Sequence, residues 1–206
     1  MESDYMPKLD NILNEVEYAL NILFEQSGAS SRDNQLDDND RKQSQRVMRV
    51  NHMGEVCAQG LYRGQALTSQ DDALEKVILK MCHEEKEHLK LCNKRLDELS
   101  GHTSYLNPLW YLTSFALGAF VGTLNKDKAL GFIYETESQV EKHLDEYTQK
   151  LPDSDAKSKD ILNKIKLDET KHKNTAKDKG STNLDDKTKI LMSTTADMMK
   201  KISFYI

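Results

Sequence analysis

Helix-breaking residues are scarce in this chain, and their positions limit the folds that it can adopt. The 206 residues contain three prolines, Pro7, Pro108 and Pro152, and nine glycines. No run rich in Val, Ile and Thr alternates apolar with polar residues for long enough to indicate a sheet. Apolar residues recur instead at helical spacing between the breakers. The sequence therefore predicts an all-α fold.

The predicted helices form two pairs joined by a long apolar connection. One pair covers residues 46–68 and 72–99, the other covers residues 128–151 and 154–179, and the uncharged run 103–125 lies between them. Two hairpins joined by one long crossover are the topology of a ferritin-like four-helix bundle. We expect one domain over residues 1–206, with an N-terminal helix at 7–26, a polar linker at 27–45, the bundle at 46–180 and an amphipathic helix at 184–206.

Composition excludes several classes of function. There are 29 Lys and Arg against 34 Asp and Glu, and no basic cluster with interleaved aromatic residues, so we expect no nucleic-acid partner. Three cysteines at Cys57, Cys82 and Cys92 fit neither a disulfide framework nor a CxxC motif, which favours reduced thiols in a cytosolic protein. The N-terminus carries no basic segment followed by an apolar one, so no signal sequence is indicated.

Two segments repeat one spacing of metal-ligating residues. The stretch EEKEH contains Glu85 and His88 three residues apart, and DETKH contains Glu169 and His172 at the same spacing. Residues three apart lie on nearly one face of an α-helix, so both side chains of a pair can reach one site. Charged runs of this kind are also common on solvated helix faces, so the spacing alone is weak.

Depth along the predicted hairpins is more informative. Glu55 precedes the first turn near Gln70 by 15 residues and Glu85 follows it by 15. Around Pro152, Glu137 and Glu169 lie 15 residues before and 17 after. At 1.5 Å per residue all four carboxylates lie about 22 to 25 Å from their turns, which places them at one level of the bundle. This arrangement matches the ligand set known for ferritin-like di-iron and di-manganese proteins.

Electrostatics favours a metal at that level. Four unpaired carboxylates would be very costly to desolvate, whereas two divalent ions would neutralise them. Carboxylate and imidazole ligands without thiolate suit iron or manganese better than structural zinc, and iron suits oxygen chemistry. The predicted ligands are Glu55, Glu85, His88, Glu137, Glu169 and His172.

Other polar residues near these positions have more ordinary interpretations. His52 either orients a carboxylate or is a satisfied histidine at a helix start. We interpret Tyr62 as a core tyrosine that could line a pocket, and exclude His143 as a ligand because it lies off the face of Glu137. Glu84, Lys86 and Glu87 are predicted to be solvated, and Glu141 is predicted to form a surface pair or to lie outside the ligand set.

Longer segments resemble one enzyme family. The stretch RVNHMGEVCAQGLYRGQAL at 49–67 closely resembles the bacterial demethoxyubiquinone hydroxylases, which are 2-polyprenyl-3-methyl-6-methoxy-1,4-benzoquinone monooxygenases. LNPLWYLTSFALGAF, GFIYETESQVEKHLDEYTQKLP and the final helix resemble them as well, so the resemblance spans nearly the whole chain. It implies di-iron ligation by the same six residues and hydroxylation of C6 of a polyprenyl benzoquinone in ubiquinone biosynthesis. It also implies dioxygen as oxidant and a reductant such as NADH.

A polyprenyl substrate implies access to a bilayer. We expect peripheral attachment to the cytoplasmic face of the inner membrane, because the crossover is too short and too rich in Gly, Ser and Thr to be read as a spanning helix. The alternative is an ordinary core helix. The side chains expected to meet lipid are Trp110, Tyr111, Phe115, Leu117 and Phe120 in the crossover and Met198, Ile202, Phe204 and Tyr205 in the last helix.

Two other functions remain open at this point. A ferritin-like iron oxidase or peroxidase would use the same six ligands without an organic substrate. A non-catalytic lipid-binding member of a quinone-synthesis complex would not need them. Other ubiquinone-biosynthesis proteins are possible partners, and the sequence does not specify tail length, electron donor or oligomeric state.

Overall fold

Seven helices make up the described part of the chain. The computed structural model describes residues 6–24, 32–33 and 35–206, and no strand occurs among them. The helices are α1 (Met6–Phe24), α2 (Asp38–Thr68), α3 (Asp72–Glu98), α4 (Asn107–Gly122), α5 (Lys126–Lys150), α6 (Ala156–Asp178) and α7 (Asp186–Ser203).

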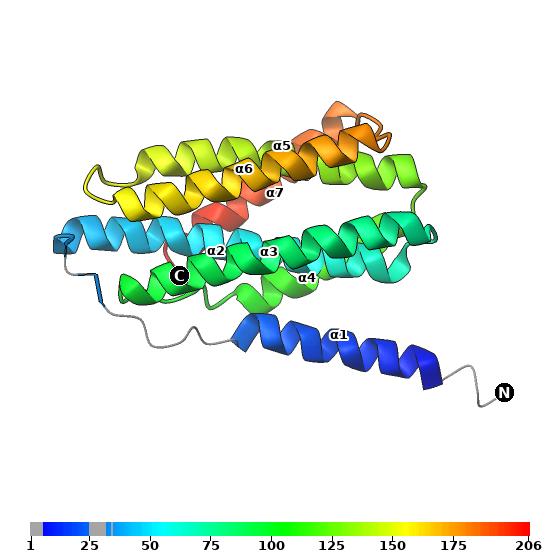
Figure 1. Cartoon of the computed structure of the whole chain (residues 1–206), viewed down its shortest axis with the longest axis horizontal. Coiled ribbons are helices and arrows are strands. Elements are labelled where there is room, and N and C mark those ends of the chain that lie inside the picture. The colour runs from blue at the N-terminus through cyan, green and yellow to red at the C-terminus, as the bar shows by residue number, and fades with distance from the viewer. Residues whose placement is uncertain (1–5, 25–31, 34) are drawn as a thin grey trace.

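The helices pack as two hairpins with a crossover (Figure 1). Helices α2 and α3 form one antiparallel pair, α5 and α6 form the other, and α4 connects them while packing along α2. Helix α1 contacts α2 and α4, and α7 contacts α2 and α5. The predicted all-α, ferritin-like bundle with an extra helix at each end is confirmed.

Capping residues set where the helices begin. The Asp37 side chain accepts hydrogen bonds from the backbone N–H groups of Asn39 and Asp40, and Asp71, Asn125, Asp155 and Asp185 cap α3, α5, α6 and α7 in the same way. The predicted linker is therefore wrong over residues 38–45, which are helical. Its polar composition hid an amphipathic start, because Arg41 and Ser44 are buried. The predicted end of the first helix, beyond Phe24, falls outside the described residues.

Helix α4 lies unusually close to α2. A Cβ atom at Gly118 would overlap the carbonyl oxygen of Leu61, and one at Gly64 would overlap the carbonyl oxygen of Phe115. Glycine at these positions therefore lets the two backbones approach one another. Trp110 and Tyr111 point inward, at 7% and 5% exposure, so the prediction that they face lipid is wrong.

The outer face of α4 is uncharged. Its exposed large apolar side chains are Leu109, Leu112, Leu117 and Phe120. Met198 and Tyr205 near the C-terminus are also exposed, whereas Ile202 and Phe204 pack against the core and were wrongly predicted to be free for lipid contact. Among the described helices, none combines the length and the apolar character that crossing a bilayer requires.

The core consists of two large apolar clusters. One joins α2, α3, α5 and α6 around Met48, Leu96 and Leu162, and the other joins α2, α3 and α5 around Tyr62, Ile78 and Ile133. Along α2 and α3 the predicted ligands Glu55 and Glu85 fall between the residues of the two clusters. The polar layer is therefore flanked by apolar core on both sides.

A buried arginine joins both hairpins near one end of the bundle. Arg95 on α3 donates to Ser158 Oγ at 2.9 Å and to Asp155 Oδ1 at 2.8 Å, both at the start of α6. It also donates to Asp33 Oδ2 at 2.8 Å and to Glu98 Oε2 at 3.1 Å. The side chains of Arg95 and Asp155 are 1% and 0% exposed, so water does not compensate the loss of either charge.

Replacing this arginine should destabilise the fold strongly. Arg95→Ala leaves Asp155 charged and buried, so we expect a loss of about 3 to 5 kcal/mol in the free energy of unfolding, measured by urea denaturation. The control is Lys157→Ala, which removes a 57% exposed partner of Glu98 and should cost less than about 1 kcal/mol. Equal stability of the two variants would contradict the role of Arg95.

Candidate metal centre

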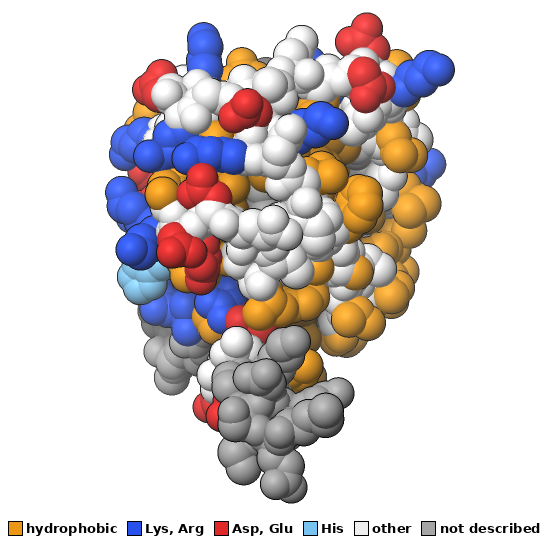
Figure 2. Space-filling model, turned by 90° about the vertical axis from the view of Figure 1, so that its right-hand side faces the viewer, with side chains coloured by type: hydrophobic (Ala, Val, Ile, Leu, Met, Phe, Trp, Pro, Cys, Tyr) orange, Lys and Arg blue, Asp and Glu red, His pale blue; other side chains and the backbone are white. Residues whose placement is uncertain are grey.

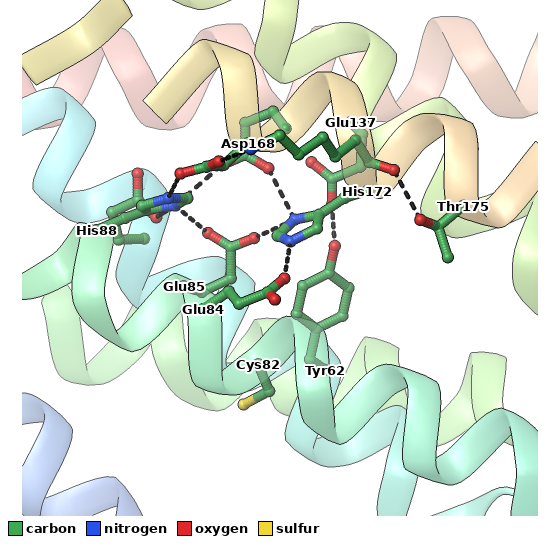
Figure 3. Close-up of polar contacts among 12 residues, drawn as sticks. Tyr62, Cys82, Glu84, Glu85, His88, Glu137, Asp168, His172 and Thr175 are labelled. Carbon is green, nitrogen blue, oxygen red and sulfur yellow. Dashed lines mark hydrogen bonds and ion pairs between the residues drawn. The ribbon is translucent and has the colours of Figure 1, made fainter. Parts of the chain in front are cut away.

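The six predicted ligand residues converge in the middle of the bundle (Figure 3). Glu55 comes from α2, Glu85 and His88 from α3, Glu137 from α5, and Glu169 and His172 from α6. All six are buried, with exposures between 1% and 5%. Helical spacing explains the convergence, because each Glu-x-x-His pair projects from one face of its helix toward the other hairpin.

The ligand atoms fall into two overlapping groups. Glu55, Glu85, His88 and Glu169 form one, and Glu85, Glu137, Glu169 and His172 form the other, with the atoms of each group within 4.8 Å of one another. Glu85 and Glu169 belong to both. The arrangement therefore has the form of a two-ion centre, with one shared carboxylate from each hairpin.

Distances to the imidazoles explain why these two carboxylates are shared. Glu85 Oε2 lies 2.9 Å from His88 Nδ1, while its Oε1 lies 2.8 Å from His172 Nδ1. Glu169 repeats the pattern, with Oε1 at 3.4 Å from His88 Nδ1 and Oε2 at 3.3 Å from His172 Nδ1. Each carboxylate thus lies between both histidines, and each Nδ1 atom faces the inside of the cluster.

A second pair of carboxylates holds the outer nitrogen of each ring. His88 Nε2 lies 3.2 Å from Asp168 Oδ2, and His172 Nε2 lies 2.7 Å from Glu84 Oε2. Each acid directly precedes a ligand glutamate in sequence, yet it reaches the histidine of the opposite hairpin. The prediction that Glu84 is merely solvated is therefore wrong, although it is 42% exposed. The paired acids in EExxH and DExxH were the available signal.

Glu87 behaves as predicted. It is 58% exposed and pairs with Lys90 at 2.8 Å. It has no place among the groups that could hold a metal in the described residues.

Burial and mutual repulsion shape the protonation of the cluster. Desolvation, followed by the charge of Glu85, raises the pKa of Glu55 well above its usual value, and desolvation with the nearby Glu169 does the same for Glu137. Burial alone would lower the pKa of His88, but hydrogen bonds with Glu169 and Glu85 outweigh it and raise that pKa to about 12. His172 follows the same balance, with its pKa raised to about 11. Imidazolium charge thus compensates part of the carboxylate charge.

Comparison with known proteins points to one family. The model of the ubiquinone biosynthesis protein COQ7 family matches residues 42–203. The chain belongs to the COQ7 family. It is 41% identical over 203 residues to a 3-demethoxyubiquinol 3-hydroxylase of Xanthomonas oryzae pv. oryzae, covering 95% of this chain and 94% of that protein. It is 38% identical over 208 residues to the protein of the same name from Nitrosospira multiformis, covering 98% and 100%.

The COQ7 match covers both hairpins except the first turn of α2, and so includes every residue of the cluster. The resemblance first noticed at residues 49–67 is thereby confirmed at the level of the family.

Tyrosine and histidine neighbours of the cluster differ from their sequence interpretations. The Tyr62 hydroxyl donates to Glu137 Oε1, so this core tyrosine also contacts a predicted ligand. His52 is within hydrogen-bonding distance of Asn107 rather than of a carboxylate, with its Nδ1 atom 3.3 Å from Asn107 Nδ2, and burial lowers its pKa to about 4. His143 lies outside both groups of possible metal ligands, as predicted. Glu141 pairs with Lys173 and accepts from Thr170, which confirms its placement outside the ligand set.

Proposed function

We propose that this COQ7-family chain is a di-iron monooxygenase that hydroxylates C6 of a demethoxyubiquinone-type polyprenyl benzoquinone. The observation that carries the proposal is the pair of shared carboxylates, Glu85 and Glu169, between two histidines in a buried cluster. The names of the relatives, 3-demethoxyubiquinol 3-hydroxylase, support the choice of substrate. The step belongs to ubiquinone biosynthesis.

The donor set fits two divalent ions. Four carboxylates carry a charge of −4, which two divalent ions balance, with the imidazoles then neutral at Nδ1. Glu55 and His88 would complete one ion's ligands, and Glu137 and His172 the other's, with Glu85 and Glu169 common to both. Oxygen and nitrogen donors without thiolate suit iron better than structural zinc.

The chain's own residues would prepare the site for oxygen chemistry. Two iron ions bound there would supply the redox chemistry that activates dioxygen. Monooxygenation places one oxygen atom in the ring C–H bond and reduces the other to water, with two electrons from a reductant such as NADH. The buried cluster excludes bulk water, Asp168 and Glu84 hold the N–H of each ligand imidazole, and the Tyr62 hydroxyl can hold a proton at Glu137.

Two alternatives use the same fold differently. An iron oxidase or peroxidase would need the six residues but no organic substrate, and it leaves the uncharged face of α4 without a role. A non-catalytic lipid-binding member of a quinone-synthesis complex would leave the buried carboxylates without a role.

A lipid analysis separates these functions. A strain lacking this protein should accumulate the demethoxy quinone, and the wild-type gene should restore ubiquinone. Glu169→Ala should fail to restore it and should lose bound iron, because one of the two shared carboxylates is gone. Normal ubiquinone in the deleted strain would refute the hydroxylase proposal. Restoration by Glu169→Ala would favour the non-catalytic alternative.

The outer carboxylates give a sharper test of the metal assignment. Glu84→Ala and Asp168→Ala each remove the acceptor that fixes one imidazole, so we expect metal affinity to fall about 10-fold or more. Competition with a chromogenic chelator measures this affinity. Glu87→Ala, on the same turn as Glu84 but paired with Lys90 outside the cluster, is the matched control and should bind metal as the wild type does. Unchanged affinity in all three variants would count against imidazole ligation.

We further propose that the α4 face binds the inner membrane peripherally from its cytoplasmic side. Apolar side chains gather along one side of the end view in Figure 2. The outward residues of α4 repeat at helical spacing without a charge, as expected of a helix that lies in a bilayer interface. Exposed apolar residues on α1 and α7 add to this surface, and they include Val16, Leu20, Ile190, Leu191 and Met198.

Charge placed on that face should abolish membrane binding. Leu112 and Phe120 are each 64% exposed, so Leu112→Glu with Phe120→Glu should fold normally and sediment poorly with phospholipid vesicles. Leu167 on α6 is 66% exposed, and Leu167→Glu is the matched control that should sediment like the wild type. The membrane proposal fails if both proteins sediment equally, or if the wild type does not bind vesicles at all.

A further inference from the structure

A cavity beside the metal centre contains two polar atoms without partners. Its walls come from α2 and α5, and the predicted ligands Glu55, Glu85, Glu137 and Glu169 line one side of it. Thr136 Oγ1 and His143 Nδ1, both on α5, are buried in the protein and make no hydrogen bond within the described residues. Such atoms are rare in folded proteins and call for a ligand or water.

The two residues share a face of α5 and stand at a particular separation. Seven residues correspond to almost two full helical turns, or about 10.5 Å of rise. The para oxygens of a six-membered ring lie roughly 5 Å apart, and two hydrogen bonds of about 2.8 Å extend that span to about 11 Å. Val140 lies between Thr136 and His143 on the same face and lines the cavity, so a flat ring would pack against it.

The remaining wall provides an opening. Gly54 on α2 lines the cavity and is exposed, and a Cβ atom added there would have no neighbour within 4 Å. The enclosed volume is about 50 Å³, which is smaller than a substituted ring, so a ring would occupy the cavity together with its mouth at Gly54. A tail on the ring would leave through this opening.

The imidazole of His143 is neutral. Burial lowers its pKa to about 3, and the positive charges of Lys200 and Lys150 lower it further. A neutral imidazole can accept a phenolic O–H at Nδ1, or donate from that atom to a carbonyl oxygen. Its ring is fixed by packing against Tyr147, with 4.1 Å between the ring centroids.

We propose that Thr136 and His143 bind the two para oxygens of the substrate ring and so hold its face against the carboxylate wall, with Gly54 keeping the mouth open. This assignment rests on the proposed function, and it adds the residues that select a para-dioxygenated ring. The ring's tail leaves at Gly54, while the ring carbon to be oxidised faces Glu55 and Glu137.

The test is direct binding of a tail-less ring. Metal-loaded protein is titrated without oxygen with 2-methoxy-5-methyl-1,4-benzoquinol in a calorimeter. Thr136→Val and His143→Phe keep shape and remove one polar atom each, so the dissociation constant should rise about fivefold in each variant, as expected for one lost hydrogen bond. Gly54→Leu should block binding while both metal ions remain, as a metal assay would show.

The control is Ser138→Ala, two residues from Thr136 on α5, whose hydroxyl is already bonded to the Tyr134 carbonyl oxygen at 2.8 Å. It should bind the ring as the wild type does. Wild-type affinity in both the Thr136→Val and His143→Phe proteins would overturn the ring-binding assignment and leave the hydroxylase proposal standing. A wild-type chain that fails to bind the ring and also fails in the lipid analysis would overturn both.

Discussion

Four carboxylates buried between two apolar clusters are the constraint on which the rest of this structure depends. Such a layer is unfavourable unless positive charge enters it. The two histidines supply part of that charge, and their pKa values are raised to about 12 and about 11 as a result. Long uninterrupted helices follow from this need, because each ligand must stand at one depth on a rigid element. The Arg95 network near one end of the bundle helps to hold that depth by joining α3 to the start of α6.

Helical periodicity and depth were enough to predict the hairpins and the convergence of the six residues. Two equal loops of helix around Gln70 and Pro152 place glutamates at one level whatever the side chains between them do. The start of α2 could not be predicted in the same way. Residues 38–45 are strongly polar, and only tertiary contacts reveal that Arg41 donates to the Leu36 carbonyl oxygen at 2.6 Å. Composition indicated a linker where a buried hydrogen bond supports a helix.

Orientation within a helix was harder to predict than depth. Trp110 and Tyr111 are aromatic residues in an apolar run, yet they face α2 and the core because glycines bring α2 and α4 together. The contact between Glu84 and His172 was missed for a related reason. Glu84 is on the edge of the inward face of α3, and whether it meets water or the opposite hairpin depends on how closely α6 approaches. Inter-helix distance is a property of packing that a single helix cannot show.

The crossed contacts of the outer carboxylates have a consequence for assembly. Asp168 of the second hairpin holds His88 of the first, and Glu84 of the first holds His172 of the second. Neither hairpin therefore orients its own imidazole. A chain in which only one half has folded presents scattered acids and a freely rotating ring rather than a preformed chelate. High-affinity capture of a cation thus becomes a late event that reports correct docking of the two halves, and the bound cation then locks that docking in place.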